Sequence, residues 1–293
     1  MFPGQGSQKP GMGAPWVATP SWAAVGVVSA VLGRDVEHLL LDADAATLQA
    51  TRNAQVASFA LGLVILDAAR AAGLHWDAAA GHSLGEYTAL VAAGVLDVED
   101  AARLVGERAE AMQDAADAAP GTMAAVLGLD TDAVQACCDA AHAWIANDNA
   151  PGQIVVAGTA EAVSAAGAAA KERGAKVMAL AVGGAFHTPL MAAAQGRLDA
   201  AIAVAPFRDT VIPVVANVDA TAHGAAGDWQ GLLSAQLCSP VRWREGVTSL
   251  GRLGVTRLLE LGPGGVLSGL AKRIAPELER LSLATPDDVA AIA

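Results

Sequence analysis

A short glycine-rich motif carries the clearest chemical signal in the sequence. The run GHSLG at 81–85 fits the pattern GxSxG, and it lies between a short apolar run and a stretch with helical spacing. Small residues around a serine let the chain turn sharply from strand to helix, which exposes the hydroxyl at the helix N-terminus. Free N–H groups and the helix dipole favour negative charge there. The motif therefore predicts that Ser83 is a nucleophile and that the Leu84 amide stabilises an oxyanion.

A serine nucleophile needs a base, and histidine is the usual one. His187 follows GGAF at 183–186, at the junction between two predicted parts of the chain, where a cleft is expected. His82 adjoins Ser83, but neighbours on a tight turn point apart, so we expect it to be structural. The other histidines lie in ordinary helix or loop contexts: His38, His75, His142 and His223. We predict that His187 is the base.

A third catalytic group is not evident. Between Ser83 and His187 the sequence offers only loop or helix acids such as Asp148. A histidine oriented by a carbonyl oxygen is sufficient for acyl transfer, so the pattern favours a serine–histidine dyad over a hydrolase triad.

Alternating strands and helices must position these residues. Apolar spacings of three and four predict long helices over 53–71, 84–95 and 98–117. Later in the chain we expect strands at 211–217 and 256–261 and helices over 232–252 and 266–274. This alternation is typical of an α/β fold with a mainly parallel sheet core and helices on both faces. We predict a hydrolase-like large subdomain that consists of 1–118 and 183–293.

The middle of the chain has a different pattern of predicted strands and helices. Strand-like runs at 123–129, 143–147, 153–157 and 176–182 enclose helical runs at 131–141 and 160–173. The order βαββαβ is that of the ferredoxin-like unit. We therefore predict an inserted ferredoxin-like small subdomain over 119–182.

The first residues, MFPGQGSQ, run straight into a glycine-rich turn. Such a turn normally follows a strand. The strand expected here would lie ahead of residue 1.

Composition limits the class of protein. Of the 293 residues, 54% are hydrophobic and 16% charged, which is enough for a sizeable core. Eighteen Lys and Arg against 30 Asp and Glu give a net charge of −12, which argues against nucleic acid and anionic membranes as partners. The longest apolar stretch, 56–66, is shorter than the roughly 18 residues of a membrane helix, and no signal peptide is visible. The three cysteines show no metal-binding spacing, so we expect a cytoplasmic protein without a metal.

Eight segments together resemble one enzyme family. They include FPGQGSQKPGMG, GHSLGEYTALVAAGVL, NDNAPGQIVVAG, GAFHTPLM, QLCSPVRW and LGPGGVLSGLAKR, with NAQ at 53–55 and GERAEAMQDA at 106–115. In the order in which they occur along the chain, they resemble malonyl-CoA:acyl carrier protein transacylases, and they cover essentially the whole chain. Close relatives of that family are the acyltransferase domains of polyketide synthases and multifunctional fatty acid synthases.

The resemblance implies a role for each matching residue. Ser83 would become a malonyl ester and His187 would be its base. Gln5 would supply a second oxyanion N–H beside that of Leu84. The carbonyl of Gln236 would orient the histidine.

The resemblance also implies how substrates are held. Arg108 matches the family's carboxylate-binding arginine, and a planar guanidinium suits the free carboxylate that distinguishes malonyl from acetyl. Phe186 would narrow the acyl pocket against an α-methyl branch. Asn149, Gln153 and Lys176 resemble positions that line the pantetheine and phosphate channel.

The implied reaction is a ping-pong transfer from malonyl-CoA to the phosphopantetheine thiol of acyl carrier protein, for fatty acid biosynthesis, by a monomer with no cofactor. A freestanding acyltransferase of a polyketide synthase and a malonyl-loading subunit of malonate decarboxylase are alternatives within the family. A serine hydrolase or thioesterase is the alternative from another class. A docking module without activity is disfavoured because Ser83 and His187 are both present.

Carrier proteins are acidic, so a uniformly negative surface would repel the partner. We therefore expect cations to gather at the mouth of the cleft. The candidates are Lys171, Arg173, Lys176, Arg242, Arg244, Lys272 and Arg273.

Overall fold

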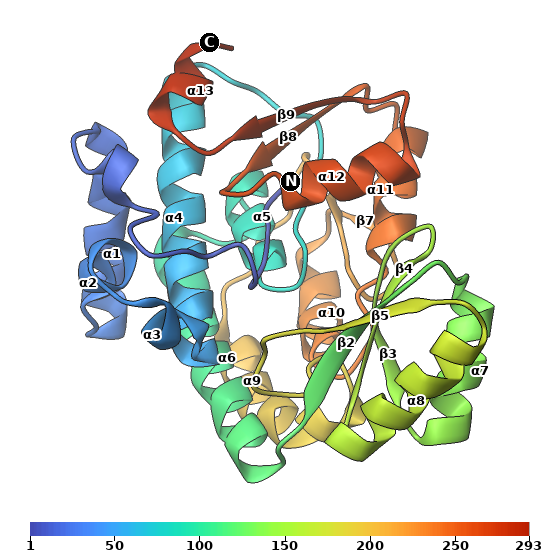
Figure 1. Ribbon diagram of the computed structural model, residues 1–293. Coiled ribbons are helices and arrows are strands. Elements are labelled where there is room, and N and C mark those ends of the chain that lie inside the picture. The colour runs from blue at the N-terminus through green and yellow to red at the C-terminus, as the bar shows by residue number, and fades with distance from the viewer. Residues whose placement is uncertain (293) are drawn as a thin grey trace.

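Two β-layers organise residues 1–292, the part of the chain that the computed structural model describes (Figure 1). In the first layer β1 (Ala79–Ala80) pairs in parallel with β6 (Val214–Val215), and β8 (Arg257–Leu261) pairs in parallel with β9 (Glu279–Leu283). β7 (Ala222–His223) adds an antiparallel edge beside β6. The second layer is an antiparallel sheet of four strands. The α/β class is thus as predicted, with parallel and antiparallel pairing in one chain.

Met1 and Phe2 fill the place between β1 and β8. The Phe2 amide donates to the Ala80 carbonyl at 3.0 Å, and Phe2 forms a parallel bridge with Gly81. On the other side the Met1 amino group donates to the Leu259 carbonyl at 2.6 Å. Met1 and Phe2 therefore connect β1 with β8 and lead directly into the glycine-rich turn.

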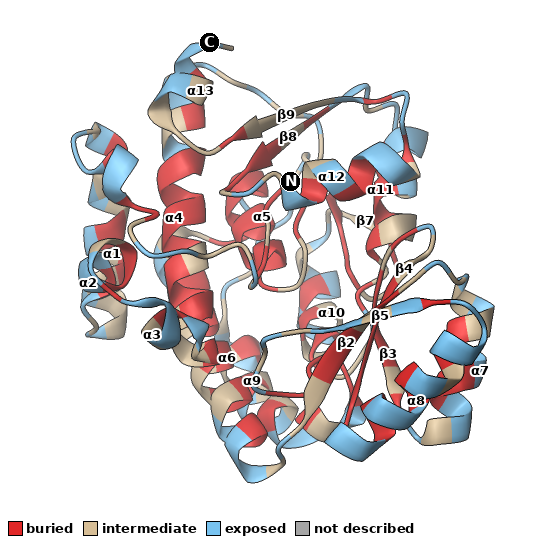
Figure 2. Ribbon diagram, viewed as in Figure 1, coloured by how far each residue is buried: buried red, intermediate tan, exposed pale blue. Residues whose placement is uncertain are grey.

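A long apolar helix, α4 (Thr51–Ala71), forms the centre of the helical layer. α1 (Ala23–Leu32), α2 (Val36–Leu41) and α3 (Ala45–Gln49) pack on its outer side (Figure 1). α4 is the one described helix whose length and composition would allow it to cross a membrane, but most of its residues are buried inside the protein (Figure 2). It is therefore a core helix of this fold.

The remaining helices connect the strands of the parallel layer and cover it. They are α5 (Gly85–Ala93), α6 (Val98–Ala118), α9 (Ala192–Val204), α10 (Trp229–Gln236), α11 (Trp243–Arg252), α12 (Val266–Ile274) and α13 (Pro286–Ala290). α6 packs against α1, α4 and α9, while α11 and α12 pack against each other.

The antiparallel sheet has the element order expected from the sequence. Its strands are β2 (Thr122–Leu127), β3 (Trp144–Ala150), β4 (Gln153–Gly158) and β5 (Lys176–Ala179), arranged as β3-β4-β2-β5. α7 (Thr131–Ala141) and α8 (Ala160–Glu172) pack against it. Apolar side chains between sheet and helices form a hydrophobic cluster separate from the main core, because each element turns one apolar face inward.

One predicted helix is divided in two. The sequence favours mostly helix over 232–252, and the structure divides this stretch: α10 ends at Gln236 and α11 begins at Trp243. Pro240 lies in the gap; it has no N–H to donate and disfavours helix in the residue before it. The freed segment pairs with β3 instead, since the Val241 amide donates to the Ala146 carbonyl at 2.9 Å. The break leaves Gln236 at a helix end that faces the site.

Candidate active site

The GHSLG run forms a strained turn between β1 and α5. Ser83 has φ +52°, in the left-handed backbone region that residues other than glycine rarely adopt. A Cβ on Gly81 would lie 1.9 Å from the Gly85 carbonyl oxygen, and one on Gly85 would lie 2.0 Å from that of Phe2. Only glycine fits at these two positions. The predicted strand–turn–helix is therefore present, and it leaves Ser83 partly exposed.

Ser83 and His187 are in direct contact. The Ser83 Oγ lies 2.7 Å from His187 Nε2, and His187 Nδ1 lies 2.9 Å from the backbone oxygen of Gln236. With the proton on Nδ1 donated to that oxygen, Nε2 is free to accept from the serine. Burial, and secondly the positive charge of Arg108, lowers the pKa of His187 to about 3. The imidazole is therefore neutral at pH 7 and able to take a proton.

Arg108 lies beside this pair in an unusual environment. It is 1% exposed, and its NH1 donates to Gln55 Oε1 at 2.6 Å. Its NH2 donates to Gln236 Oε1 and to Ser83 Oγ, both at 3.0 Å. Its Nε has no hydrogen-bond partner among residues 1–292, and within that range no ion pair includes Arg108. A buried guanidinium held only by neutral groups is ready to bind an anion.

Two residues that the sequence did not single out hold the turn in place. Asn217 accepts from the Ser83 amide and donates to the Gly81 carbonyl, both at 2.7 Å. Glu86 accepts from the Asn217 amide at 2.8 Å and from the Gln236 side-chain amide. Burial raises the pKa of Glu86 to about 7. A carboxylate on the buried face of the helix directly after the motif was the signal available in the sequence.

The glycine-rich turn near the N-terminus lies against the GHSLG run. A Cβ on Gly4 would lie 2.4 Å from the His82 carbonyl oxygen and 3.6 Å from the Leu84 nitrogen. Neither the Gln5 amide nor the Leu84 amide donates a hydrogen bond within the described residues. The close approach of Gly4 to the His82 carbonyl brings the turn that carries Gln5 against the GHSLG run. Free backbone donors of this kind are what an oxyanion hole requires, and the roles of Gln5 and Leu84 stay predictions.

Comparison with known proteins bears directly on this geometry. The family described as "Acyl transferase domain" matches residues 1–269. The chain is 39% identical to a malonyl CoA-acyl carrier protein transacylase of Bacillus subtilis, over 99% of this chain and 94% of the relative. It is 40% identical to the protein of the same name from Escherichia coli K12, over 99% and 97%. The chain belongs to this family of acyltransferases.

Solved structures of the family share its fold throughout. A malonyl-CoA:acyl carrier protein transacylase of Xanthomonas oryzae superposes with a TM-score of 0.95 at 43% identity, covering 99% of this chain and 95% of that one. A second match, with a TM-score of 0.95 and 38% identity, covers 99% of this chain and 96% of that one. It is a malonyl-transacylase in complex with an acyl carrier protein of a type II polyketide synthase.

The other residues predicted from the transacylase resemblance make different contacts, and one of them touches the GHSLG motif directly. Asn149 contacts the motif itself, because its Oδ1 accepts a hydrogen bond from His82 Nε2 at 2.8 Å. Gln153 instead accepts from Arg273 at 2.7 Å, and Lys176 lies on the exposed strand β5. Phe186 is buried, with its ring close to Gly184. No described hydrogen bond links Gln153 or Lys176 to Ser83, so their channel roles stay predictions.

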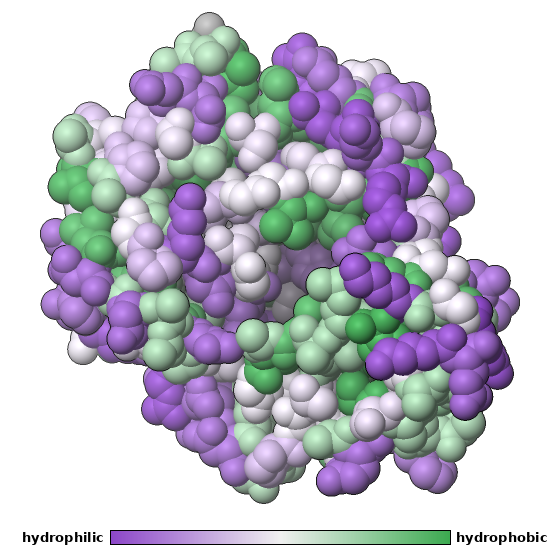
Figure 3. Space-filling view, in the orientation of Figure 1, coloured by the Kyte–Doolittle hydropathy of each residue, from purple (hydrophilic) through white to green (hydrophobic). Residues whose placement is uncertain are grey.

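The face drawn in Figure 3 is hollowed near its centre, between α12 and β5 as Figure 1 places them. Two of the seven candidate cations, Arg244 and Arg273, line one cavity of about 810 Å³ beside the turn at 150–152. Arg244 donates to Asp148 at 2.7 Å, and Arg242 pairs with Glu245, so carboxylates offset part of this charge. That the other candidate cations lie at the mouth of the cleft stays a prediction.

Proposed function

We propose that the chain transfers the malonyl group of malonyl-CoA to the phosphopantetheine thiol of acyl carrier protein through a malonyl ester on Ser83, for fatty acid biosynthesis. The observation that carries the choice of acyl group is Arg108. Its buried guanidinium has no carboxylate partner in the described chain and donates to the Ser83 Oγ at 3.0 Å. A free carboxylate two bonds beyond the reacting carbonyl would supply that missing charge.

In the first half-reaction His187 Nε2 takes the proton of Ser83 as Oγ attacks the thioester carbonyl. The negative charge that develops on the carbonyl oxygen is held by the amides of Gln5 and Leu84. When the C–S bond breaks, His187 returns the proton to the CoA sulfur. The 2.7 Å contact between Ser83 and His187 supports this assignment.

The second half-reaction uses the same groups in reverse. The pantetheine thiol gives its proton to His187 and attacks the ester, and the proton then returns to Ser83 as the C–O bond breaks. The Gln236 carbonyl keeps Nδ1–H in place through both steps, at 2.9 Å. The serine, the histidine and backbone amides supply nucleophile, base and oxyanion stabilisation, so the proposed chemistry needs no cofactor.

The remaining assignments are proposals of the same kind. Phe186 would shape the acyl pocket, and Asn149, Gln153 and Lys176 would line the channel. The enzyme would act as a cytoplasmic monomer. The separate hydrophobic cluster of the antiparallel sheet supports an inserted ferredoxin-like subdomain at 119–182 in a hydrolase-like one.

Intact-mass measurement tests the proposal in one series. Mixing with malonyl-CoA should add one malonyl group to the chain, and adding a carrier protein should move that group to its pantetheine arm. Ser83→Ala should show neither change. A malonyl adduct on the Ser83→Ala chain would overturn the assignment.

A second candidate is a freestanding acyltransferase of a polyketide synthase, because one structural match is such a transacylase with its carrier protein. Transfer rates to a fatty acid carrier protein and to a polyketide carrier protein, measured side by side, distinguish the two. Rapid release of free malonate without any carrier protein would instead indicate a hydrolase.

A further inference from the structure

The buried polar cluster behind Ser83 contains one carboxyl group and one guanidinium group. Glu86 on α5 and Arg108 on α6 are each 1% exposed. The other members of the cluster are uncharged at pH 7: Gln55, His187, Asn217 and Gln236. The mechanism above uses the guanidinium but gives the carboxyl group no part in the chemistry, although an ionised carboxyl group is costly to bury.

Gln236 connects the two charged groups. Its Oε1 accepts from Arg108 NH2 at 3.0 Å, and its Nε2 donates to one carboxylate oxygen of Glu86 and to the Ser83 carbonyl. The other carboxylate oxygen of Glu86 accepts from the Asn217 amide at 2.8 Å. No described ion pair joins Glu86 to Arg108 directly. The two charges therefore act on each other across one neutral amide.

Two charged side chains act on Glu86, and they oppose each other. Arg108 favours the ionised carboxyl group, whereas Asp219, in the loop after β6, favours the neutral one. The Asp219 side chain is 37% exposed and pairs with His223 at 2.9 Å, so water and the imidazole weaken its influence. Arg108 is therefore the dominant charge at this carboxyl group.

The other elements packed against α5 bring no further charge to the carboxyl group. They are α4, β1 and β6, and the two strands carry no titratable side chain. On α4 Arg52 pairs with carboxylates of α6, Asp67 is exposed, and Arg70 donates to backbone carbonyls at the C-terminal end of α5. Burial lowers the pKa of His82 and raises that of Tyr87, so both are neutral at pH 7.

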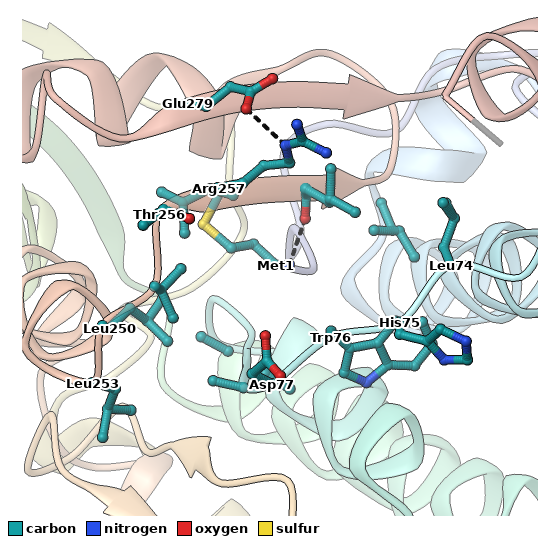
Figure 4. A pocket seen from close by; sticks show the side chains of 18 of the residues that line it. Met1, Leu74, His75, Trp76, Asp77, Leu250, Leu253, Thr256, Arg257 and Glu279 are labelled. Carbon is teal, nitrogen blue, oxygen red and sulfur yellow. Dashed lines mark hydrogen bonds and ion pairs between the residues drawn. The ribbon is translucent and has the colours of Figure 1, made fainter.

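Two cavities of the chain lie apart from the cluster. The one in Figure 4, of about 490 Å³, is lined by residues such as Trp76, Arg257 and Glu279, and the other, of about 810 Å³, by the turn at 150–152. In Figure 4 the charged side chains of Arg257 and Glu279 pair with each other, at 2.7 Å. No member of the cluster lines either cavity. Neither cavity therefore gives water access to Glu86.

The charge of Glu86 is balanced near neutral pH. Burial raises the pKa of Glu86 to about 7, because hydrogen bonds from Asn217 and Gln236 and the charge of Arg108 offset only part of the cost of desolvation. At pH 7 the carboxyl group is therefore ionised in about half of the molecules. A malonyl carboxylate bound to Arg108 is a second anion in the same site. The site would then carry excess negative charge with Glu86 ionised, but none with Glu86 protonated, which is the less costly state.

We propose that Glu86 is the counter-charge of Arg108 in the unloaded enzyme and takes a proton from solvent when the malonyl carboxylate binds to Arg108. The proton forms an O–H bond on one carboxylate oxygen, and no other covalent bond changes. Glu86 is thus a positioning residue that acts through Arg108 and does not touch the substrate. This inference rests on the proposed malonyl transfer, and it makes the binding of malonyl, but not of acetyl, depend on pH.

His187 is not the site of this proton uptake. Its pKa of about 3 lies far below pH 7, and burial is a larger cause of that low value than the charge of Arg108. Neutralising Arg108 therefore leaves His187 uncharged near pH 7. Proton uptake near pH 7 thus reports on Glu86.

Calorimetry counts the protons directly. Malonyl-CoA is titrated at pH 7 into the full chain with Ser83→Ala, which binds it without forming the ester, in buffers with different heats of ionisation. The matched ligand is acetyl-CoA, which carries the same phosphates but no carboxylate. We expect malonyl-CoA to take up about half a proton more than acetyl-CoA, since about half of the Glu86 carboxyl groups start ionised. The excess should be larger at pH 8.

A matched pair of variants assigns the excess to one residue. Glu86→Gln in the Ser83→Ala chain keeps the size and polarity of the side chain but cannot take a proton, so the excess uptake should vanish. Glu99→Gln, at an exposed position on α6, should retain it.

Transfer rates with Ser83 intact give a second measurement. The KM for malonyl-CoA should rise from pH 7 to pH 8 by up to about tenfold, because ionised Glu86 opposes the second anion. The KM for acetyl-CoA should not rise, and Glu86→Gln should remove the rise for malonyl-CoA. A purely structural role of Glu86 would instead lower kcat for both substrates at every pH.

Three results would overturn the proposal: equal proton uptake for the two ligands, an excess that persists in Glu86→Gln, or a KM for malonyl-CoA that stays level between pH 7 and 8. The first and third need no change at Glu86, so they hold even if that variant does not fold. Absence of a malonyl ester on the chain with Ser83 would contradict the proposed function itself. An ester formed without excess proton uptake would contradict only the role of Glu86.

Discussion

The polar cluster behind Ser83 and the apolar interior of the antiparallel sheet are both buried, but they bury different chemistry. The cluster consists of Gln55, Glu86, Arg108, His187, Asn217 and Gln236, none more than 4% exposed. The sheet interior is made of aliphatic side chains such as Val126, Val134 and Ile154. Aliphatic burial stabilises a fold directly, whereas buried charge costs free energy unless it is compensated.

The difference indicates what each region contributes. The cluster holds Ser83, His187 and Arg108 in one geometry, with most donors and acceptors paired and one cation left without an anion. The sheet interior needs only volume and apolarity. Substitutions in the cluster should therefore affect transfer more than stability, and substitutions in the sheet interior should do the reverse.

The largest expected effect is at Ser83. Ser83→Ala removes the nucleophile, so malonyl transfer should fall by about 10⁴-fold or more. The melting temperature should change little, because the hydroxyl is at the partly exposed edge of the cluster. Transfer rates and thermal denaturation on the same preparation check both points. A comparable loss of stability would contradict the division between the two regions.

The matching test in the sheet is Ile154→Ala. Ile154 is 1% exposed in β4, and removing a buried aliphatic side chain costs about 2–5 kcal/mol of unfolding free energy. The transfer rate per folded molecule should stay the same, since no described hydrogen bond runs from Ile154 to the cluster beyond the strand pairing. Val211→Ala, at a side chain that is 97% exposed, is the control and should change neither quantity.

Arg108 gives a smaller effect that depends on the substrate. Arg108→Met keeps the apolar stem and removes the charge, and the lost charge-assisted bonds are worth about 1.5–3 kcal/mol, or about 10–100-fold in kcat/KM for malonyl-CoA. Acetyl transfer should not fall, because acetyl has no carboxylate. Arg103→Ala, on the exposed side of the same helix, is the matched control. An equal fall for both substrates would mean that Arg108 does not bind the carboxylate.

The same contrast explains what the sequence could predict. The Ser83 turn and the antiparallel sheet depend on residues close together in the chain, so motif and periodicity were sufficient. Asn217 is 134 residues from the serine whose amide it accepts from. Its role, and that of Glu86, depends on how distant segments meet. The break at Pro240, which brings Gln236 to the histidine, was hidden by helical spacing on both sides of it.

The smallest expected effect is a dependence of stability on pH. The folded pKa of Glu86, about 7, lies above its ordinary value of 4.5, so its stabilising contribution is complete below 4.5 and is lost as pH rises to 7. The folded pKa of His187, about 3, lies below 6.5, so its contribution is complete above 6.5 and is lost as pH falls to 3. Between pH 4.5 and 6.5 the Glu86 contribution lowers the unfolding free energy as pH rises and the His187 contribution raises it, so the two slopes offset each other.

Glu86→Gln separates the two slopes. Without the carboxyl, the unfolding free energy should rise with pH from about 3 to 6.5 by up to about 1.4 kcal/mol per pH unit, because Glu86 no longer offsets the histidine contribution. Urea unfolding at pH 5, 6 and 7 measures this slope against the unchanged chain. Glu99→Gln, at an exposed position on α6, should leave the original slope. A Glu86→Gln slope equal to that of the original chain would mean that Glu86 is ionised in the folded protein as readily as on the surface, and that burial of the cluster carries no cost at this residue.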